Sequence, residues 1–263
     1  MKIDSYPIRK RFGQNFLCDQ NIIEEIINII KPQRNDHIIE IGPGKGALTI
    51  PIIKFIKKLD VIEIDKNLAN LLKKNINNKY LTIYEEDALK FNYAKLNNFD
   101  LRIIGNLPYN ISTPLLFHLL SFKKIIKDML FMLQKEVVDR ICAQRGTKEY
   151  GRLSVTLQYY CEVESKLTIG PEAFHPAPKV NSAIIRITPR QKPKYQLSSE
   201  DCFETIVREA FSQRRKTLRN GLKKYVNETD IKEMGIPLNE RAENLKVKDF
   251  VNLSNLYYQS KNN

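Results

Sequence analysis

The chain has 263 residues, of which 42% are hydrophobic and 28% charged, so we expect one or two domains with a sizeable core and exclude wholesale disorder. Lys and Arg number 43 and Asp and Glu 30, which leaves a net charge of +13 and favours a polyanionic partner, although an AT-biased genome would also supply lysine. No apolar run is long enough for a membrane span or a signal peptide, and the cysteines and histidines are dispersed, so we expect a cytoplasmic protein that binds no metal.

The first predicted element is a helix that Asp19 caps and that ends at Ile30, before Pro32. Short apolar or β-branched runs then predict buried strands at His37–Ile41, Val61–Ile64, Leu81–Tyr84, Leu101–Ile104 and Met129–Leu133. Helix-length segments lie between them, at Ala47–Lys58, Lys66–Asn77 and Thr113–Lys124. Strands that alternate with helices predict crossover connections and therefore a parallel sheet.

The pattern changes after residue 150, where a predicted helix, Gly151–Tyr160, is followed by two strand-like runs. These runs, Glu162–Ile169 and Val180–Thr188, have little helix between them, so we expect them to pair antiparallel at one sheet edge. Residues 189–198 are polar and punctuated by proline, as in a linker, and residues 199–263 have helical spacing. The sequence therefore predicts an α/β domain at 1–188 and a small all-α domain at 199–263.

Three features at successive strand ends predict a pocket for adenosine. Gly42, Gly44 and Gly46 follow the first strand and let the backbone turn sharply beside a ligand. Glu63 ends the second strand, where a carboxylate can bind both ribose hydroxyls, and Asp87 follows the third, where it can accept from an adenine amino group. Each feature alone is as well explained by a turn glycine or a capping aspartate. Together they favour a nucleoside site.

The motif Asn106-Leu107-Pro108-Tyr109 ends the fourth strand and resembles the signature of S-adenosylmethionine-dependent methyltransferases that alkylate exocyclic amines of bases. The Asn106 oxygen and a carbonyl beside Pro108 can accept both N6 hydrogens of adenine and aim the nitrogen lone pair at the methyl donor. Tyr109 offers a face on which an extruded base can stack. The alternative is an Asn-Pro turn with a core tyrosine.

Three longer segments, 9–17, 170–180 and 210–220, closely resemble segments of the bacterial small-subunit (16S) ribosomal RNA adenine dimethyltransferases, the kasugamycin-resistance methyltransferases. The resemblance extends over essentially the whole chain. It implies a Rossmann-like class I methyltransferase sheet and S-adenosylmethionine as cofactor. It also implies dimethylation of N6 on two adjacent adenosines near the 3′ end of small-subunit RNA, within the subunit or its precursor, and a role in subunit biogenesis. We expect a monomer, because the basic face must stay open.

The resemblance also implies site residues. The cofactor site would be formed by Gln14, Asn15, Leu17, Gly42, Gly44, Glu63, Asp87 and Asn106, and the target base would be held by Leu107, Pro108, Tyr109 and Phe174. Phe174 lies in a proline-rich loop and is the expected stacking partner of Tyr109, the alternative being an aromatic side chain packed into the core. The family loop commonly has a small or apolar residue where this chain has Lys45.

Between Arg208 and Lys224 the sequence predicts a basic helix with an apolar face on the opposite side. Its basic residues outnumber the single acid, Glu209, and we expect the phosphate backbone of RNA to bind Arg208, Arg214, Arg215, Lys216, Arg219 and Lys223. A solvated charged face is the alternative, although such faces usually mix signs. Arg9, Lys10 and Arg11 are a second candidate contact.

Two other functions stay open at this point. One is a large-subunit RNA dimethyltransferase of the macrolide-resistance type, against which the segments at 12–17 and 213–219 and Leu107 argue. The other is a ribosome-assembly factor in which methylation is secondary or lost. The intact Asn106-Leu107-Pro108-Tyr109 motif and Glu63 argue that catalysis is retained.

Overall fold

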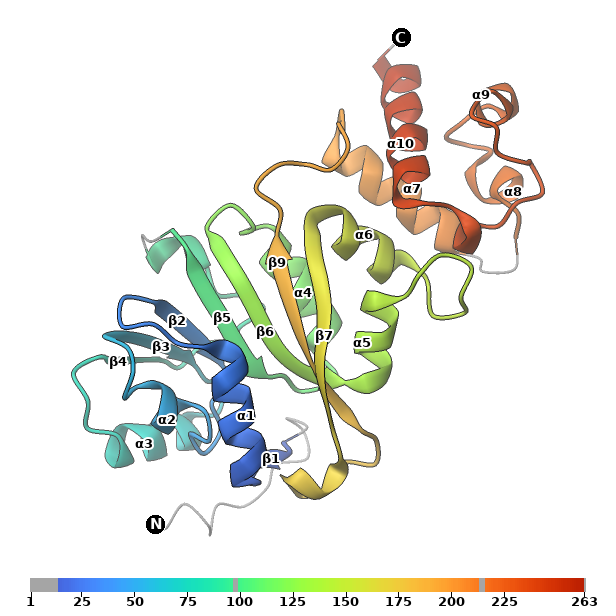
Figure 1. Ribbon diagram of the computed structural model, residues 1–263. Coiled ribbons are helices and arrows are strands. Elements are labelled where there is room, and N and C mark those ends of the chain that lie inside the picture. The colour runs from blue at the N-terminus through green and yellow to red at the C-terminus, as the bar shows by residue number, and fades with distance from the viewer. Residues whose placement is uncertain (1–13, 97–98, 213–215, 263) are drawn as a thin grey trace. The chain divides into compact units, whose positions relative to one another are not determined.

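The structure is a computed structural model that describes residues 14–96, 99–212 and 216–262 (Figure 1). Its described residues form two compact units. The first contains the residues up to Val138 together with Glu164–Pro189, and the second contains Asp139–Val163 together with the residues from Arg190 onward. No helix among the described residues is long and apolar enough to cross a membrane.

A seven-stranded sheet organises the first unit, with the order β4-β3-β2-β5-β6-β9-β7. Its strands are β2 (His37–Ile41), β3 (Lys58–Ile62), β4 (Leu81–Tyr84), β5 (Leu101–Asn106), β6 (Ile126–Gln134), β7 (Cys161–Ile169) and β9 (Ser182–Pro189). The strands from β4 to β6 in this order are parallel, and β9 is antiparallel to β6. The predicted parallel sheet with an antiparallel edge is therefore confirmed, and the two runs after residue 150 are neighbours at that edge.

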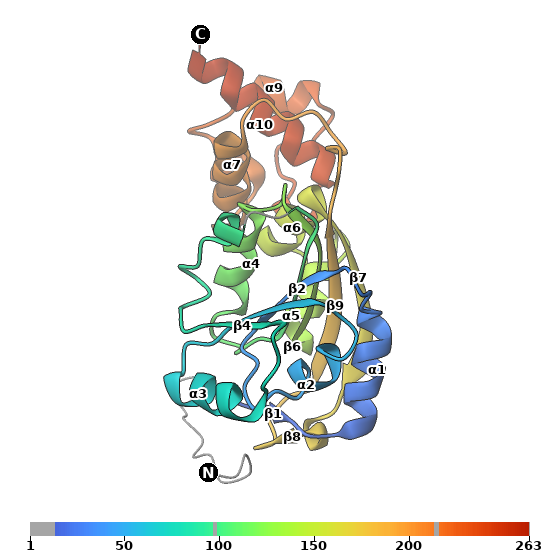
Figure 2. The same cartoon turned by 90° about the vertical axis from the view of Figure 1, so that its left-hand side faces the viewer.

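Helices cover both faces of this sheet (Figure 2). They are α1 (Gln20–Ile30), α2 (Thr49–Ile52), α3 (Lys66–Asn75), α4 (Ser112–Leu120) and the start of α5 (Lys135–Cys142). As predicted, Asp19 caps α1, accepting hydrogen bonds from the backbone N–H groups of Asn21 and Ile22. The isoleucines of α1 pack on the sheet in one apolar cluster with residues such as Ile38 and Val61.

Several predicted boundaries in this unit are wrong. Strand β6 begins three residues before the predicted Met129, and α4 ends at Leu120 instead of Lys124. Two further cases, at α2 and β3, have a clear physical reason. The helix expected at Ala47–Lys58 is only the four residues of α2, because the chain must turn back to begin β3 at Lys58. That strand begins three residues before the predicted Val61. Its charged residue Asp60 interrupts the apolar pattern of the strand, but the Asp60 carboxylate lies 2.5 Å from His37 Nε2 on the neighbouring strand, which allows it to be buried.

The second unit is helical apart from the first residues of β7. It contains the end of α5, α6 (Arg152–Tyr160), α7 (Glu200–Ser212), α8 (Leu218–Leu222), α9 (Glu228–Glu233) and α10 (Val247–Asn262), with a short 3₁₀ turn at Ala242–Asn244. Its own apolar core centres on Phe203 and Phe250. The small all-α region predicted at the C-terminal end of the chain is therefore present, whereas the proposed linker at 189–198 stays a prediction.

The predicted basic helix is not continuous. Helix α7 ends at Ser212, and α8 begins only at Leu218, after Thr217 has adopted an extended conformation. The prediction that Arg208–Lys223 form one basic stripe on a single helix is therefore wrong, because these residues belong to two separate helices. Arg214 and Arg215, like Arg9, Lys10 and Arg11, lie outside the described residues.

Candidate functional site

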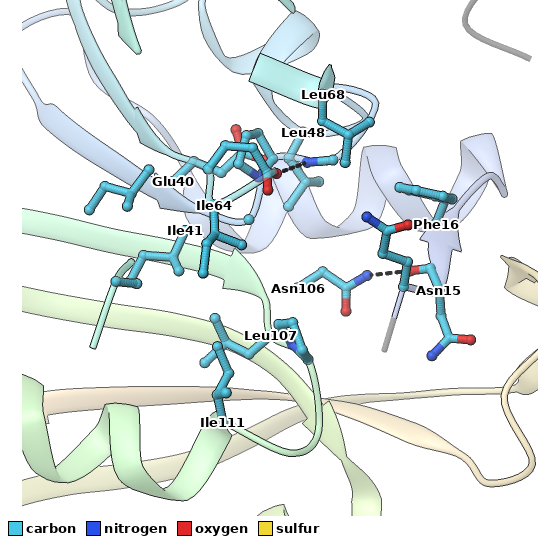
Figure 3. A pocket seen from close by; sticks show the side chains of 18 of the residues that line it. Asn15, Phe16, Glu40, Ile41, Leu48, Ile64, Leu68, Asn106, Leu107 and Ile111 are labelled. Atoms are coloured by element: carbon cyan, nitrogen blue, oxygen red, sulfur yellow. Dashed lines mark hydrogen bonds between the residues drawn. The ribbon is translucent and has the colours of Figure 1, made fainter. Parts of the chain in front are cut away.

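A cavity of about 290 Å³ lies at the carboxyl ends of β2, β3, β4 and β5 (Figure 3). Parallel strands place the loops after them at one sheet edge, where ligands of such folds bind. The cavity is lined by residues 14–17, 40–45, 47–48, 62–64, 86–89 and 106–111, together with Leu68. The cavity lies wholly within the first unit. It thus brings together all the predicted cofactor residues and the whole Asn106–Tyr109 motif.

The three glycines of the loop after β2 have backbone conformations in the left-handed region. The backbone φ angles of Gly42, Gly44 and Gly46 are 66°, 57° and 89°. Residues that carry a Cβ rarely adopt such positive values. A Cβ on Gly44 would stand 3.1 Å from the ring of Phe16, in the short strand β1 (Phe16–Leu17). The absence of a side chain at Gly44 therefore leaves room for Phe16 of the N-terminal segment to lie against the loop.

Two buried carboxylates line the cavity. Glu63, directly after β3, accepts hydrogen bonds from the N–H of Asp65 at 2.9 Å and of Gly44 at 3.3 Å, yet desolvation raises its pKa to about 7. Glu40, in β2, accepts a 2.6 Å hydrogen bond from Thr49 Oγ1, and burial likewise raises its pKa to about 7. Each site therefore holds its carboxyl group close to the balance between its charged and neutral forms at neutral pH.

Asp87 follows β4 and is half-buried at the cavity wall. Its Oδ1 accepts a 3.0 Å hydrogen bond from the N–H of Leu89, as in the capping role that was the alternative reading. The two readings are compatible, because that bond occupies one carboxylate oxygen and the other can bind a ligand.

The amide of Asn106 has a defined orientation. Its Nδ2 donates a 3.0 Å hydrogen bond to the backbone oxygen of Asn15, 91 residues away in the chain. Because the backbone carbonyl of Asn15 can only accept, the amide NH2 group of Asn106 must face Asn15. Figure 3 shows the Asn106 side-chain oxygen turned away from Asn15. Asn15 thus fixes Asn106 with its Oδ1 presented as an acceptor. Gln14, the residue before it, donates to Asp65 at 3.4 Å.

Close strand packing places Asn106 beside the glycine loop. A Cβ on Gly105 would stand only 2.5 Å from the backbone oxygen of Ile41 in the adjacent strand. No side chain fits at that distance, so glycine is required for β5 to approach β2 this closely. Gly105 therefore allows the close strand packing, and the residue after it, Asn106, presents its amide to the cavity.

Tyr109 lines the cavity, and its hydroxyl is 2.9 Å from Ser182 Oγ, at the buried start of β9. Sequence reasoning did not identify Ser182 as a site residue. No local signal marks it, because the contact spans 73 residues.

Phe174 does not line the cavity. It is 4% exposed, lies in the short strand β8 (Phe174–His175) opposite Leu17 of β1, and packs in the core cluster of the first unit. In this conformation its ring therefore has the core position that was the alternative reading. Its predicted stacking with a base requires a different arrangement of β8.

Several cavity residues were not predicted from the sequence, among them Glu40, Phe16, Ile64 and Lys45. Ile64 immediately follows Glu63 and is 51% exposed, which an apolar ligand face would explain. The position of Glu40 two residues before Gly42 is the one signal that could have found it, since both belong to the strand–loop junction.

Known proteins resemble this chain in sequence and in fold. A family model for ribosomal RNA adenine dimethylase matches residues 6–259. The ribosomal RNA small subunit methyltransferase A of Hydrogenovibrio crunogenus is 51% identical over 259 residues, which are 96% of this chain and 97% of that protein. A dimethyladenosine transferase from Plasmodium falciparum matches with a TM-score of 0.81 and 27% identity, over 94% of this chain and 98% of that one. The 23S rRNA methyltransferase ErmE shares the fold, with a TM-score of 0.71, 22% identity and coverage of 93% and 100%.

Proposed function

The chain belongs to the ribosomal RNA adenine dimethylase family, and from this membership we propose that it transfers methyl groups from S-adenosylmethionine to N6 of two adjacent adenosines near the 3′ end of small-subunit RNA. The identity of 51% to a small-subunit methyltransferase, over nearly the whole of both chains, supports that target. The likeness to the large-subunit enzyme ErmE, at 22% identity, is a likeness of fold.

The cavity fits the cofactor. The glycine loop leaves backbone space beside β2, Glu63 is a buried carboxylate that two ribose hydroxyls would satisfy, and Asp87 keeps one oxygen for the adenine amine. Leu17, 7% exposed, lines the cavity and packs in the apolar core of the first unit. The cofactor supplies an electrophilic methyl group on a sulfonium.

The observation that carries the proposal is the orientation of Asn106. The N6 lone pair of adenine is delocalised into the ring, so the nitrogen is a poor nucleophile until its hydrogens are held out of the ring plane. Asn106 Oδ1 is presented for one hydrogen by the bond from Nδ2 to Asn15, and the carbonyl of Leu107, held by Pro108, would accept the other. Catalysis then consists of positioning and electrostatics and needs no strong base.

Tyr109 is the proposed stacking surface for the extruded base. Its hydroxyl contact with Ser182 holds the ring at the cavity wall, which makes Ser182 a positioning residue. Phe174 remains the proposed second face of the stack, and this role requires β8 to move so that the ring leaves the core.

Replacement of the Ser182 hydroxyl tests this arrangement. We expect Ser182→Ala to lower kcat about three- to tenfold with little change in the Kd of the cofactor, because one hydrogen bond that orients Tyr109 is lost. Tyr109→Phe should cost a similar factor, and the double variant should be no worse than either single variant. Steady-state methylation kinetics measure all three, and additive losses would contradict the positioning role.

Exposed basic residues of the second unit are the proposed RNA contacts. Arg208, Lys216, Arg219 and Lys223 are all exposed, although Arg208 lies 3.0 Å from Glu209 and Arg219 lies 2.6 Å from Glu228. These two arginines are partly neutralised. Among the described residues Lys216 and Lys223 are therefore the cleaner candidates for phosphate binding.

A salt titration tests this surface. Lys216→Ala together with Lys223→Ala should weaken subunit binding and reduce the slope of log K against log salt by about one to two, since each phosphate contact contributes ~0.7–0.9. Lys246→Ala together with Lys248→Ala, two exposed lysines of the same unit, is the matched control. Equal slopes for the two variants would show that the first pair is ordinary solvated surface.

We further propose that the enzyme acts as a monomer in the cytoplasm, on RNA within the small subunit or its precursor, and contributes to subunit biogenesis. Its relatives named for the small subunit support this context. Purified protein and labelled S-adenosylmethionine, mixed separately with small and large subunits from a strain lacking the enzyme, test the target. Label is expected in small-subunit RNA, and label in large-subunit RNA would contradict the proposal.

A further inference from the structure

Acidic side chains outnumber basic ones in the lining of the cavity. The described lining residues include the acids Glu40, Glu63, Glu86 and Asp87. Among those same lining residues, Lys45 is the one basic side chain. An acidic cavity suits a cationic ligand, and a single cation in such a cavity is available to one negative group. S-adenosylmethionine has this pattern, because its sulfonium and ammonium are positive and only its carboxylate is negative.

Lys45 is held at one place in this cavity. It stands between Gly44 and Gly46 and is half-buried, and its Nζ lies 5.0 Å from the centroid of the Phe16 ring. This cation–π contact keeps the ammonium beside β1. Within the part of the chain that the structure describes, Lys45 forms no ion pair with a carboxylate. The cation is thus positioned and available.

The position corresponds to one end of the cofactor. Glu63 and Asp87 would fix the ribose and the adenine, and Asn106 marks the place of methyl transfer. The amino-acid tail must then lie beyond the sulfur, between the glycine loop and the N-terminal segment. Phe16 and Lys45 belong to these two segments. Nothing in the family resemblance assigns this lysine, because a small or apolar residue is expected there.

We propose that Lys45 forms an ion pair with the carboxylate of the cofactor's methionine tail. This inference rests on the proposed function. It would give this chain a cofactor contact that relatives with an apolar residue there must supply in another way. Because Lys45 is half-buried, the pair is shielded from water only in part, and the expected contribution to affinity is about three- to tenfold.

Calorimetric titration with two ligands isolates this contact. S-adenosylhomocysteine has the tail carboxylate, and S-adenosyl-3-thiopropylamine is the same molecule without it and keeps the ammonium. We expect Lys45→Met to weaken binding of S-adenosylhomocysteine about three- to tenfold and to leave binding of the decarboxylated analogue within about twofold. Lys45→Arg, which keeps the charge, should retain most of the preference for the carboxylate.

Each other outcome overturns the inference in a recognisable way. Equal losses for both ligands would show that Lys45 only supports Phe16 and the loop. Unchanged binding of both ligands, with a shallower salt dependence of subunit binding in Lys45→Met, would assign the lysine to RNA. If the wild-type protein bound neither ligand, the proposed function itself would fail, and with it the inference.

Discussion

Asn106→Ala is expected to lower the rate of methyl transfer about 100- to 1,000-fold at saturating cofactor and RNA. The side chain is presented by its bond to Asn15 as an acceptor for the amine that reacts, and loss of one such preorganised group typically costs two to three orders of magnitude. Single-turnover methylation measures the chemical step apart from product release.

Binding measurements give this experiment its control. Subunit affinity should stay within about threefold of wild type, because base positioning and not phosphate contact is lost. Asn106→Asp should be comparably slow, since a carboxylate cannot donate to the Asn15 oxygen that orients the side chain. A turnover near wild type in either variant would remove Asn106 from the mechanism.

Glu63→Gln is expected to weaken binding of S-adenosylhomocysteine by about 10- to 100-fold. The carboxylate would accept from two ribose hydroxyls, and hydrogen bonds to a charged group are worth ~1.5–3 kcal/mol each. The amide that replaces it can accept with only one oxygen. Calorimetric titration at pH 8, where the wild-type group is ionised, shows the full loss.

The pH dependence of binding follows from the same residue. Burial raises the pKa of Glu63 to about 7 in the cofactor-free protein, and ribose hydroxyls that donate to the ionised form would lower it on binding. Wild-type affinity should therefore be highest above pH 7 and fall as the pH drops below 7. Glu63→Gln should remove this dependence. Glu40→Gln, at the other buried carboxyl with a pKa of about 7, should retain it, and loss of the dependence there instead would assign it to Glu40.

Most of the fold could be predicted from local patterns. The isoleucine-rich strands and the Asp19 cap are signals of short range, so β2, β4 and α1 have the predicted bounds or nearly so. The failures lie where a long-range partner decides. Asp60 can be buried within β3 because its carboxylate contacts the His37 side chain of the neighbouring strand, two residues away from its register partner Ile39. The apolar spacing after Ala47 is also typical of a helix, and only the position of β3 shows that the chain must turn back before Lys58.

The site shows the same division. The motif residues Gly42, Glu63, Asp87 and Asn106 can be found from sequence, because each stands at the end of a predicted strand. The contacts that orient them cannot, since Asn15 holds Asn106 across 91 residues and Ser182 holds Tyr109 across 73. Phe174 illustrates the limit, because a loop aromatic gives no local sign of whether a strand such as β1 will bury it.

The most direct test of the proposed function is mass spectrometry of ribonuclease fragments from small-subunit RNA. Subunits from a strain lacking the enzyme would be treated with the wild-type protein and S-adenosylmethionine, and Asn106→Ala would serve as the inactive comparison. We expect N6,N6-dimethyladenosine at two adjacent adenosines near the 3′ end with the wild-type protein and none with the variant. Methylation of another base, of large-subunit RNA, or to an equal extent by the variant would contradict it.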